Sequence, residues 1–283
     1  MTYKELKQAF SSLGITEIGI VSADNGNSTI NNDCSDLNKK KTISDINDIL
    51  MGAKSIIVFL LPYNSGAKAE NLSVYATGKD YHKVCKEISD KISTKLTEAG
   101  YKSVSFADTG PLSERKLAHE AGLGIIGDNR FLINEKYGTY TFIGYIITDC
   151  PLPPTPSKAG ECLKCGKCIS SCPGQALTPK SFCKDKCISY LTQKKGELSE
   201  EEARLIKKGK SAWGCDICQM VCPMNYKKSL TELPYFKENL ILCIKNEYLS
   251  NNEFRKKYSD RAFAWRGKAV IDRNLSILND NID

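Results

Sequence analysis

The sequence lacks a long hydrophobic run. Its most apolar stretch, residues 55–62, covers eight residues, whereas a helix that crosses a membrane needs roughly 20. The first ten residues also lack the cationic and then apolar pattern of a secretory signal. We therefore expect a cytoplasmic protein that does not associate with membranes.

A large excess of charge is lacking as well. The 283 residues carry a formal net charge of +7 and are 41% hydrophobic, which excludes a mainly disordered chain. Residues 1–150 hold 17 Lys and Arg against 18 Asp and Glu, and residues 151–283 hold 23 against 15. The second half thus carries all of the positive excess, which indicates bound anionic clusters or an anionic partner there.

Cysteine, in contrast, is abundant. The chain has 13 cysteines, and nine of them lie between Cys162 and Cys222. A reducing cytosol disfavours a disulfide framework, so this density indicates metal or redox chemistry. The cysteines outside this segment, and Cys183 within it, are expected to be small buried or surface residues; those outside it are Cys34, Cys85, Cys150 and Cys243.

The periodicity of apolar residues predicts an α+β protein. In residues 1–150, helices are expected over 3–13, 80–99 and 112–121, and strands over 17–21, 55–61, 103–106 and 139–148. The proline-rich stretch 151–156 is the best domain boundary. We therefore predict an α/β domain over 1–150, a cysteine-rich module over 151–225, and a basic helical tail over 226–283.

The cysteine spacing over 162–173 is that of bacterial ferredoxins, C-x2-C-x2-C-x3-C-P. In that pattern three thiolates bind one cubane iron–sulfur cluster and the fourth reaches a second cluster, so a partner motif is needed. Residues 215–223 supply it as C-x2-C-x3-C-P. Structural zinc is disfavoured, because zinc sites usually combine two well-separated cysteine pairs.

Aligning the two motifs places Ala212 where the second motif lacks its first cysteine. The missing ligand can come from Cys183 or Cys187, which lie between the motifs. One cluster is then expected on Cys162, Cys165, Cys168 and Cys222. The other is expected on Cys172, Cys215 and Cys218 with that additional cysteine. Two neighbouring clusters form an electron path, so the first domain should hold an electron acceptor.

Three sequence motifs in the first domain each allow a functional and a structural interpretation when taken singly. Residues 122–127 match G-x-G-x-x-G, but a predicted helix precedes them, which excludes a dinucleotide fingerprint. Residues 80–85 half-match the corrinoid motif D-x-H-x-x-G, and Asp80 is better interpreted as a helix N-cap. Asp108 follows a predicted strand; a turn-forming role is slightly favoured over a chemical one.

Together, several segments resemble the epoxyqueuosine reductase family. The segments that carry the resemblance are 78–83, FADTGPLSER at 106–115, AHEAGLGIIG at 118–127, YTFIGYIIT at 140–148, CISYLT at 187–192 and GCDICQ at 214–219. With the cysteine order, the similarity runs from about residue 15 to residue 224. It implies a cobalamin-binding α/β domain, fused to a ferredoxin-like module with two [4Fe-4S] clusters, that reduces epoxyqueuosine in tRNA to queuosine.

The resemblance also implies roles for single residues. It assigns the remaining cluster ligand to Cys187 and the proton donor to Asp108, whose pKa an apolar corrin pocket should raise. It implies no protein histidine on cobalt. The residues implied to line cobalamin are Ser73, Asp108, Leu132, Ile143, Ser189, Asp216 and Ile217.

The expected partners are tRNA and an unidentified low-potential electron donor, with the protein a monomer. The tRNA backbone would contact basic side chains at Lys194, Lys195, Lys207, Lys208, Lys210, Arg255, Lys256, Lys257, Arg261, Arg266 and Arg273. The chain departs from the family in having Asp128 where a lysine is usual, and in its short tail. These departures favour an alternative, a corrinoid iron–sulfur reductase of a small molecule. A non-catalytic electron-transfer protein is a third hypothesis.

Overall fold

The computed structural model describes residues 1–29, 45–157 and 160–279. Within them, the main sheet has four strands in the order β1-β2-β6-β3, and each neighbouring pair is antiparallel. The strands are β1 (Ile18–Ser22), β2 (Ser55–Pro62), β3 (Ser103–Ala107) and β6 (Thr141–Thr148). The four strands expected from the sequence are confirmed, with bounds shifted by one or two residues.

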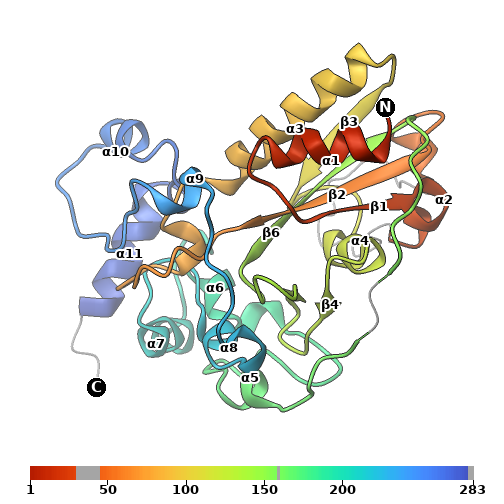
Figure 1. Ribbon diagram of the computed structural model, residues 1–283. Helices are drawn as coiled ribbons and strands as arrows, with labels where there is room; N and C mark the ends of the chain where they lie inside the picture. Colours follow the sequence, from red (N-terminus) through yellow and green to blue (C-terminus); the bar gives the residue numbers. More distant parts are fainter. Residues whose placement is uncertain (30–44, 158–159, 280–283) are drawn as a thin grey trace.

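Strand β2 forms the centre of the sheet and is buried along its whole length. Alternate side chains pack on opposite faces, as the two-residue period of a strand requires. Ile57 and Phe59 pack beneath α1 (Tyr3–Ser11) and α3 (Tyr81–Glu98). Ile56 and Val58 face α2 (Ala23–Gly26) and α4 (Glu114–Glu120). Figure 1 shows α1 and α3 on one side of the sheet and α4 on the other.

The start of α3 confirms the predicted N-cap. Asp80 Oδ1 accepts the backbone N–H of His82 at 3.0 Å. The helix then buries one stripe, which contains Val84, Ile88 and Ile92, against β2 and β6. This packing brings the first turn of α3 to the end of β3.

The glycine pattern at 122–127 ends a helix, as expected, and does not begin one. Gly122 follows α4 with φ of +75°, a conformation that favours glycine. The chain then forms a small hairpin of β4 (Ile125–Ile126) and β5 (Leu132–Ile133).

The cysteine-rich segment forms short helices joined by loops. They are α5 (Lys167–Ser170), α6 (Ile188–Leu191), α7 (Glu200–Gly209) and α8 (Ile217–Met220). Figure 1 shows them gathered beyond one end of the sheet. The single-turn 3-10 helices of the described chain are η1 (Asn27–Thr29), η2 (Ile46–Asp48), η3 (Val74–Ala76), η4 (Lys184–Lys186), η5 (Pro223–Asn225) and η6 (Ala262–Ala264).

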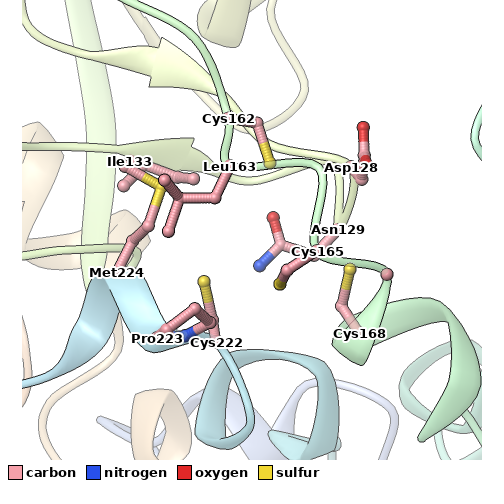
Figure 2. A pocket seen from close by; sticks show the side chains of 11 residues that line it. Asp128, Asn129, Ile133, Cys162, Leu163, Cys165, Cys168, Cys222, Pro223 and Met224 are labelled. Atoms are coloured by element: carbon pink, nitrogen blue, oxygen red, sulfur yellow. The ribbon is translucent and has the colours of Figure 1, made fainter.

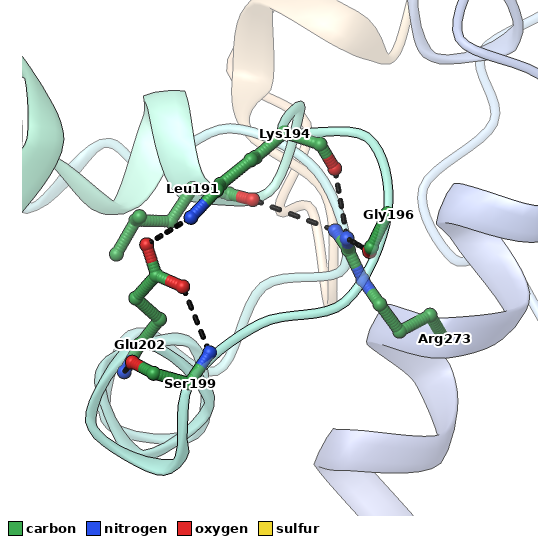
Figure 3. A network of polar contacts seen from close by, with 6 residues as sticks. All are labelled: Leu191, Lys194, Gly196, Ser199, Glu202 and Arg273. Carbon is green, nitrogen blue, oxygen red and sulfur yellow. Dashed lines mark hydrogen bonds and ion pairs between the residues drawn. The ribbon is translucent and has the colours of Figure 1, made fainter.

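The C-terminal segment packs against both preceding parts. Its helices are α9 (Pro234–Lys237), α10 (Asn251–Lys257) and α11 (Lys268–Asn279). Phe236 enters the core beneath α1 and α3, and Ile271 packs in a cluster with Trp213. Arg273 donates to the carbonyl oxygens of Lys194 at 2.8 Å and Gly196 at 2.6 Å (Figure 3). None of the described helices combines the length and apolar character needed to cross a bilayer.

A substitution at Phe59 tests how much the core of the sheet contributes to stability. Its side chain is fully buried and its ring centroid lies 5.3 Å from that of Phe10. We expect Phe59→Ala to lower the free energy of unfolding by about 3–5 kcal/mol, because it removes buried area and leaves a cavity. Urea unfolding followed by circular dichroism measures this loss. The control Met51→Ala, at a side chain that is 87% exposed, should change it by less than about 0.5 kcal/mol.

Candidate functional site

Four cysteines from both motifs line one pocket. They are Cys162, Cys165, Cys168 and Cys222, and we call them the first sulfur group. Figure 2 shows their sulfur atoms around a common space. Asp128 and Asn129, from the loop between β4 and β5, lie on the wall of this pocket.

A second group of cysteines lies close enough together for its members to influence one another's pKa values. Burial raises the pKa of Cys215 to about 12, and the neighbouring Cys187 and Cys172 add to this shift. Burial likewise raises the pKa of Cys218, again with contributions from the other three thiols. We call Cys172, Cys187, Cys215 and Cys218 the second sulfur group. One of the two sets of four that crossing the motifs predicts thus lines a single pocket, and the second set stays a prediction.

Two short helices connect the sulfur groups. Helix α5 carries Cys168 of the first group and leads into Cys172 of the second, and α5 contacts α8. Helix α8 carries Cys218 of the second group and leads into Cys222 of the first. The groups are thus neighbours, which is the arrangement that electron transfer between two bound clusters needs.

The other cysteines lie apart from these groups. Cys183 is exposed, Cys85 and Cys150 are buried among apolar side chains of the sheet domain, and Cys243 is partly buried. Cys34 lies outside the described residues.

Asp108 lies directly after β3, at the edge of the sheet domain. Its φ of +59° is in the left-handed region, which is uncommon for a residue other than glycine. The N–H of Thr109 donates to the carbonyl oxygen of Ala107 at 2.7 Å across this residue. Such strained positions occur often at functional sites.

His82 connects Asp108 to the start of α3. Its Nε2 lies 3.3 Å from Asp108 Oδ2, and its Nδ1 lies 2.9 Å from Asp80 Oδ1. Burial alone would lower the pKa of His82, but the two carboxylates outweigh it and raise the pKa to about 9. The imidazole is therefore protonated at neutral pH, with a carboxylate at each nitrogen.

The pKa of Asp108 shifts opposite to our sequence-based expectation. The hydrogen bond from His82 lowers it despite the opposing effect of burial, and Tyr81 also donates to the carboxylate. The expectation considered only an apolar pocket and missed the cationic neighbour. In this structure the proton near Asp108 resides on His82.

Glu114 is a second acid near Asp108. Burial raises the pKa of Glu114 to about 8, and the negative charge of Asp108 contributes. Its Oε1 atom is buried without a hydrogen-bond partner. The carboxyl group of Glu114 is therefore protonated at neutral pH and lies near the His82–Asp108 pair.

Asp216 connects the two main parts of the protein. Its Oδ1 accepts the hydroxyl of Ser73, and its Oδ2 accepts the N–H of Val74 at 2.7 Å. Burial raises the pKa of Asp216, and these donors oppose that shift. Asp216 and Ile217 lie between Cys215 and Cys218 of the second sulfur group. Two of the implied cobalamin-lining residues, Ser73 and Asp216, are therefore in direct contact.

Other implied lining residues lie in the sheet domain or the cysteine module. Leu132 and Ile143 are buried in one apolar cluster on the α4 face of the sheet. Ser189 belongs to α6, and its carbonyl oxygen accepts the Thr192 hydroxyl at 3.0 Å.

Some predicted tRNA contacts are already engaged within the protein. Lys194 forms an ion pair of 2.6 Å with Glu202, seen in Figure 3. Arg273 donates to backbone carbonyls, and Arg261 donates to the carbonyls of Thr77 and Asn239. These arginines stabilise loops in this structure.

Comparisons with known proteins agree with this arrangement. A family model described as epoxyqueuosine reductase QueG, DUF1730, matches residues 44–109, and one described as a 4Fe-4S double cluster binding domain matches residues 161–225. An epoxyqueuosine reductase from Leadbetterella byssophila is 38% identical over 248 residues, which cover 83% of this chain and 80% of the relative. The chain belongs to the epoxyqueuosine reductase family. Its segment 161–225 is accordingly a domain for two 4Fe-4S clusters.

Lengths differ within the family. The relative from Bacillus anthracis is 35% identical, and the match covers 80% of this chain but 63% of that protein. The chain thus spans less than two thirds of that relative.

Solved structures of the family have the same fold. An epoxyqueuosine reductase with a tRNA-Tyr epoxyqueuosine-modified stem loop superposes with a TM-score of 0.85 at 29% identity, covering 97% of this chain and 80% of that one. The enzyme from Bacillus subtilis gives a TM-score of 0.83 at 28% identity, with the same coverage. A catabolic reductive dehalogenase, at 18% identity and a TM-score of 0.56 over 95% of this chain, shares the fold alone.

Sequence reasoning missed the part played by His82. The signal was the spacing of Asp80 and His82, which half-matches the corrinoid motif and which we interpreted in favour of a helix N-cap. It also missed the amide of Asn129 in the pocket of the first sulfur group, because nothing in the local sequence indicates that this side chain is buried against the cysteines.

The pairing of His82 with Asp108 can be measured directly. We expect the imidazole of His82 to titrate near pH 9, and Asp108→Asn to move this midpoint down towards the ordinary value of about 6.5. Because the folded pKa is raised, the stabilisation from His82 is complete below about pH 6.5 and is lost as pH rises through about 9. Nitrogen-15 NMR of the imidazoles measures both.

The chain has two histidines, so His119 provides an internal reference. Its signals should be the same in the wild type and in Asp108→Asn at every pH. An unchanged His82 midpoint in the variant would show that Asp108 does not hold the imidazole proton.

Proposed function

We propose that this protein reduces epoxyqueuosine in tRNA to queuosine, with two [4Fe-4S] clusters and cobalamin as cofactors. The observation that carries the proposal is the contact between Ser73 of the sheet domain and Asp216, which lies between two cysteines of the second sulfur group. An electron that reaches the second sulfur group is then next to the implied cobalamin site, and Asp108 and His82 supply a proton from the sheet domain.

The eight cysteines of the two sulfur groups fit the clusters. Burial raises the pKa of the thiols of Cys215 and Cys218, so without a metal they stay protonated and neutral. Iron binding favours the thiolates and compensates for this burial. The first sulfur group also faces the buried Asn129 Nδ2, a donor without a partner in the protein. We assign Cys187, and not the exposed Cys183, as the eighth ligand.

The side chains around Ile143 combine apolar groups with one unsatisfied polar atom, a chemistry that suits a large ring with polar edges. Leu132 and Ile143 belong to the buried apolar cluster on the α4 face of the sheet. Thr141, two residues before Ile143 and hence on the same face of β6, has a buried hydroxyl without a partner. The amide groups at the edge of a corrin would satisfy it. When bound, the clusters supply single electrons, and cobalamin supplies the reducing centre for breaking a C–O bond.

Conversion of an epoxide to an alkene consumes two electrons and two protons and releases water. His82 holds a proton at neutral pH, hydrogen-bonded to Asp108. Asp108 can pass that proton to the departing oxygen while His82 remains positioned by Asp80. Glu114, with its raised pKa, holds another proton nearby. The proton donor is thus the His82–Asp108 pair rather than Asp108 alone.

Several features support tRNA as the substrate. The positive excess lies in residues 151–283. Trp265 is 58% exposed, and the guanidinium carbon of Arg266 lies 3.6 Å from its ring centroid. Exposed aromatic rings and arginine planes stack on nucleic-acid bases. A structural relative was solved with a modified tRNA stem loop. Modification of tRNA also fits a cytoplasmic protein, with a low-potential protein as electron donor.

A small-molecule substrate is the second candidate. It is favoured by Asp128, an anion on the wall of the first sulfur group where the family usually has a lysine. The salt dependence of substrate binding distinguishes the two candidate substrates. Binding of a tRNA stem loop through phosphates should weaken steeply as salt rises, whereas binding of an uncharged small substrate should not.

The ligand assignment predicts a difference between two cysteine variants. Cys187→Ser should lose about four of eight irons per chain, or bind that cluster weakly, because the second sulfur group keeps three thiols. Cys183→Ser is the matched control and should keep all eight, since its thiol is exposed and lies outside both groups. Iron analysis of protein prepared without oxygen measures this. Equal iron in both variants contradicts the assignment.

The activity predicts a role for Asp108. We expect Asp108→Asn to slow conversion of an epoxyqueuosine-containing stem loop by roughly 10²–10⁴-fold, with iron content and stem-loop affinity unchanged. Wild-type turnover should fall as pH rises through about 9, when His82 loses its proton. Anaerobic assays with cobalamin and a reductant, analysed by nucleoside mass spectrometry, measure both. Asp90→Asn, on exposed α3 surface, is the control; full turnover by Asp108→Asn excludes the donor role.

A further inference from the structure

The loop between β4 and β5 reaches the first sulfur group as a closed turn. The N–H of Gly127 donates to the carbonyl oxygen of Phe131, and the N–H of Arg130 donates to that of Gly127, both at 2.9 Å. Arg115 donates from outside to the carbonyl oxygen of Arg130. These bonds hold the loop in one conformation, so the direction of its side chains is defined.

Asn129 is the buried residue of this turn. It is 4% exposed. Its Oδ1 accepts the backbone N–H of Phe131 at 3.3 Å, and this contact assigns the oxygen and nitrogen ends of the amide. The Nδ2 end is buried and has no protein partner. Figure 2 shows it pointing into the space between the sulfur atoms of the first sulfur group.

A buried donor without an acceptor is rare in folded proteins, because losing water without a replacement is costly. The pocket that receives Nδ2 is lined mainly by cysteine sulfurs and apolar side chains. Thiolates and sulfides of an iron–sulfur cluster accept hydrogen bonds, and such bonds stabilise the reduced state because it carries more negative charge.

We propose that Asn129 donates an N–H···S hydrogen bond to the cluster held by Cys162, Cys165, Cys168 and Cys222, and that this bond raises the reduction potential of that cluster. The proposal rests on the two clusters of the proposed function. It makes Asn129 a tuning residue that does not itself bind iron.

We expect the neighbouring Asp128 to lower the reduction potential of the same cluster. Its carboxylate points away from the sulfur atoms in Figure 2, but the residue lines the same pocket as Cys162, Cys165, Cys168 and Cys222. A negative charge near the cluster disfavours the reduced state. Residues 128 and 129 therefore provide a matched pair, because one side chain donates a hydrogen bond and the other contributes only charge.

The test is a redox titration of the holoprotein, with the reduced clusters followed by electron paramagnetic resonance. In Asn129→Leu we expect one of the two midpoint potentials to fall by about 59 mV, a tenfold change for a one-electron couple, while the other stays the same. In Asp128→Asn the same midpoint should rise. Unchanged midpoints in Asn129→Leu, with eight irons bound, overturn the proposal and leave the proposed function intact.

A second measurement needs no variant. Wild-type protein labelled with nitrogen-15 at asparagine side chains should show a hyperfine coupling between one reduced cluster and a nitrogen in pulsed resonance spectra. Absence of this coupling also overturns the proposal, even where Asn129→Leu fails to fold. Protein that binds far fewer than eight irons when prepared without oxygen refutes the clusters themselves, which is a separate result.

Discussion

The structure depends on the shared use of two short helices by two groups of sulfur atoms. Helix α5 serves the first group through Cys168 and leads to the second through Cys172, and α8 does the reverse through Cys218 and Cys222. Neither group is complete without both motifs, so residues some fifty positions apart must fold together. The core that surrounds Trp213 and the contacts of α11 hold this arrangement against the sheet domain.

The cysteine module and the sheet domain differ in their electrostatics. In the cysteine module, burial raises the pKa of the thiols of Cys215 and Cys218 and so favours their neutral form. In the sheet domain, two carboxylates hold a proton on His82 beside a strained Asp108. The hydrogen bond between Ser73 and Asp216 joins these two halves.

Much of this arrangement could be predicted from the sequence, because the signals are local. The apolar run at β2, the N-cap at Asp80 and the spacing of the cysteines each follow from a few neighbouring residues. The need for a second motif also followed from the spacing of the first, and the crossing of their last cysteines is a prediction from the bacterial ferredoxin pattern.

Features that depend on packing between distant segments could not be predicted. His82 and Asp108 are 26 residues apart and meet only because α3 packs along β3. The pKa of Asp108 therefore moved opposite to the expectation. Similarly, the sequence of 226–279 indicates basic helices, but not that Phe236 and Ile271 enter two separate cores.

The bond from Ser73 to Asp216 is reinforced by backbone pairing between Leu72 and Trp213 and by the N–H of Ser73, which donates to the carbonyl oxygen of Trp213 at 2.8 Å. Gly214 lies against Ser73 so closely that an added methyl group would clash with it. The sheet domain and the cysteine module are consequently joined by several contacts where Ser73 meets Asp216. The position of the second sulfur group relative to the sheet domain is accordingly set by backbone as well as side-chain contacts.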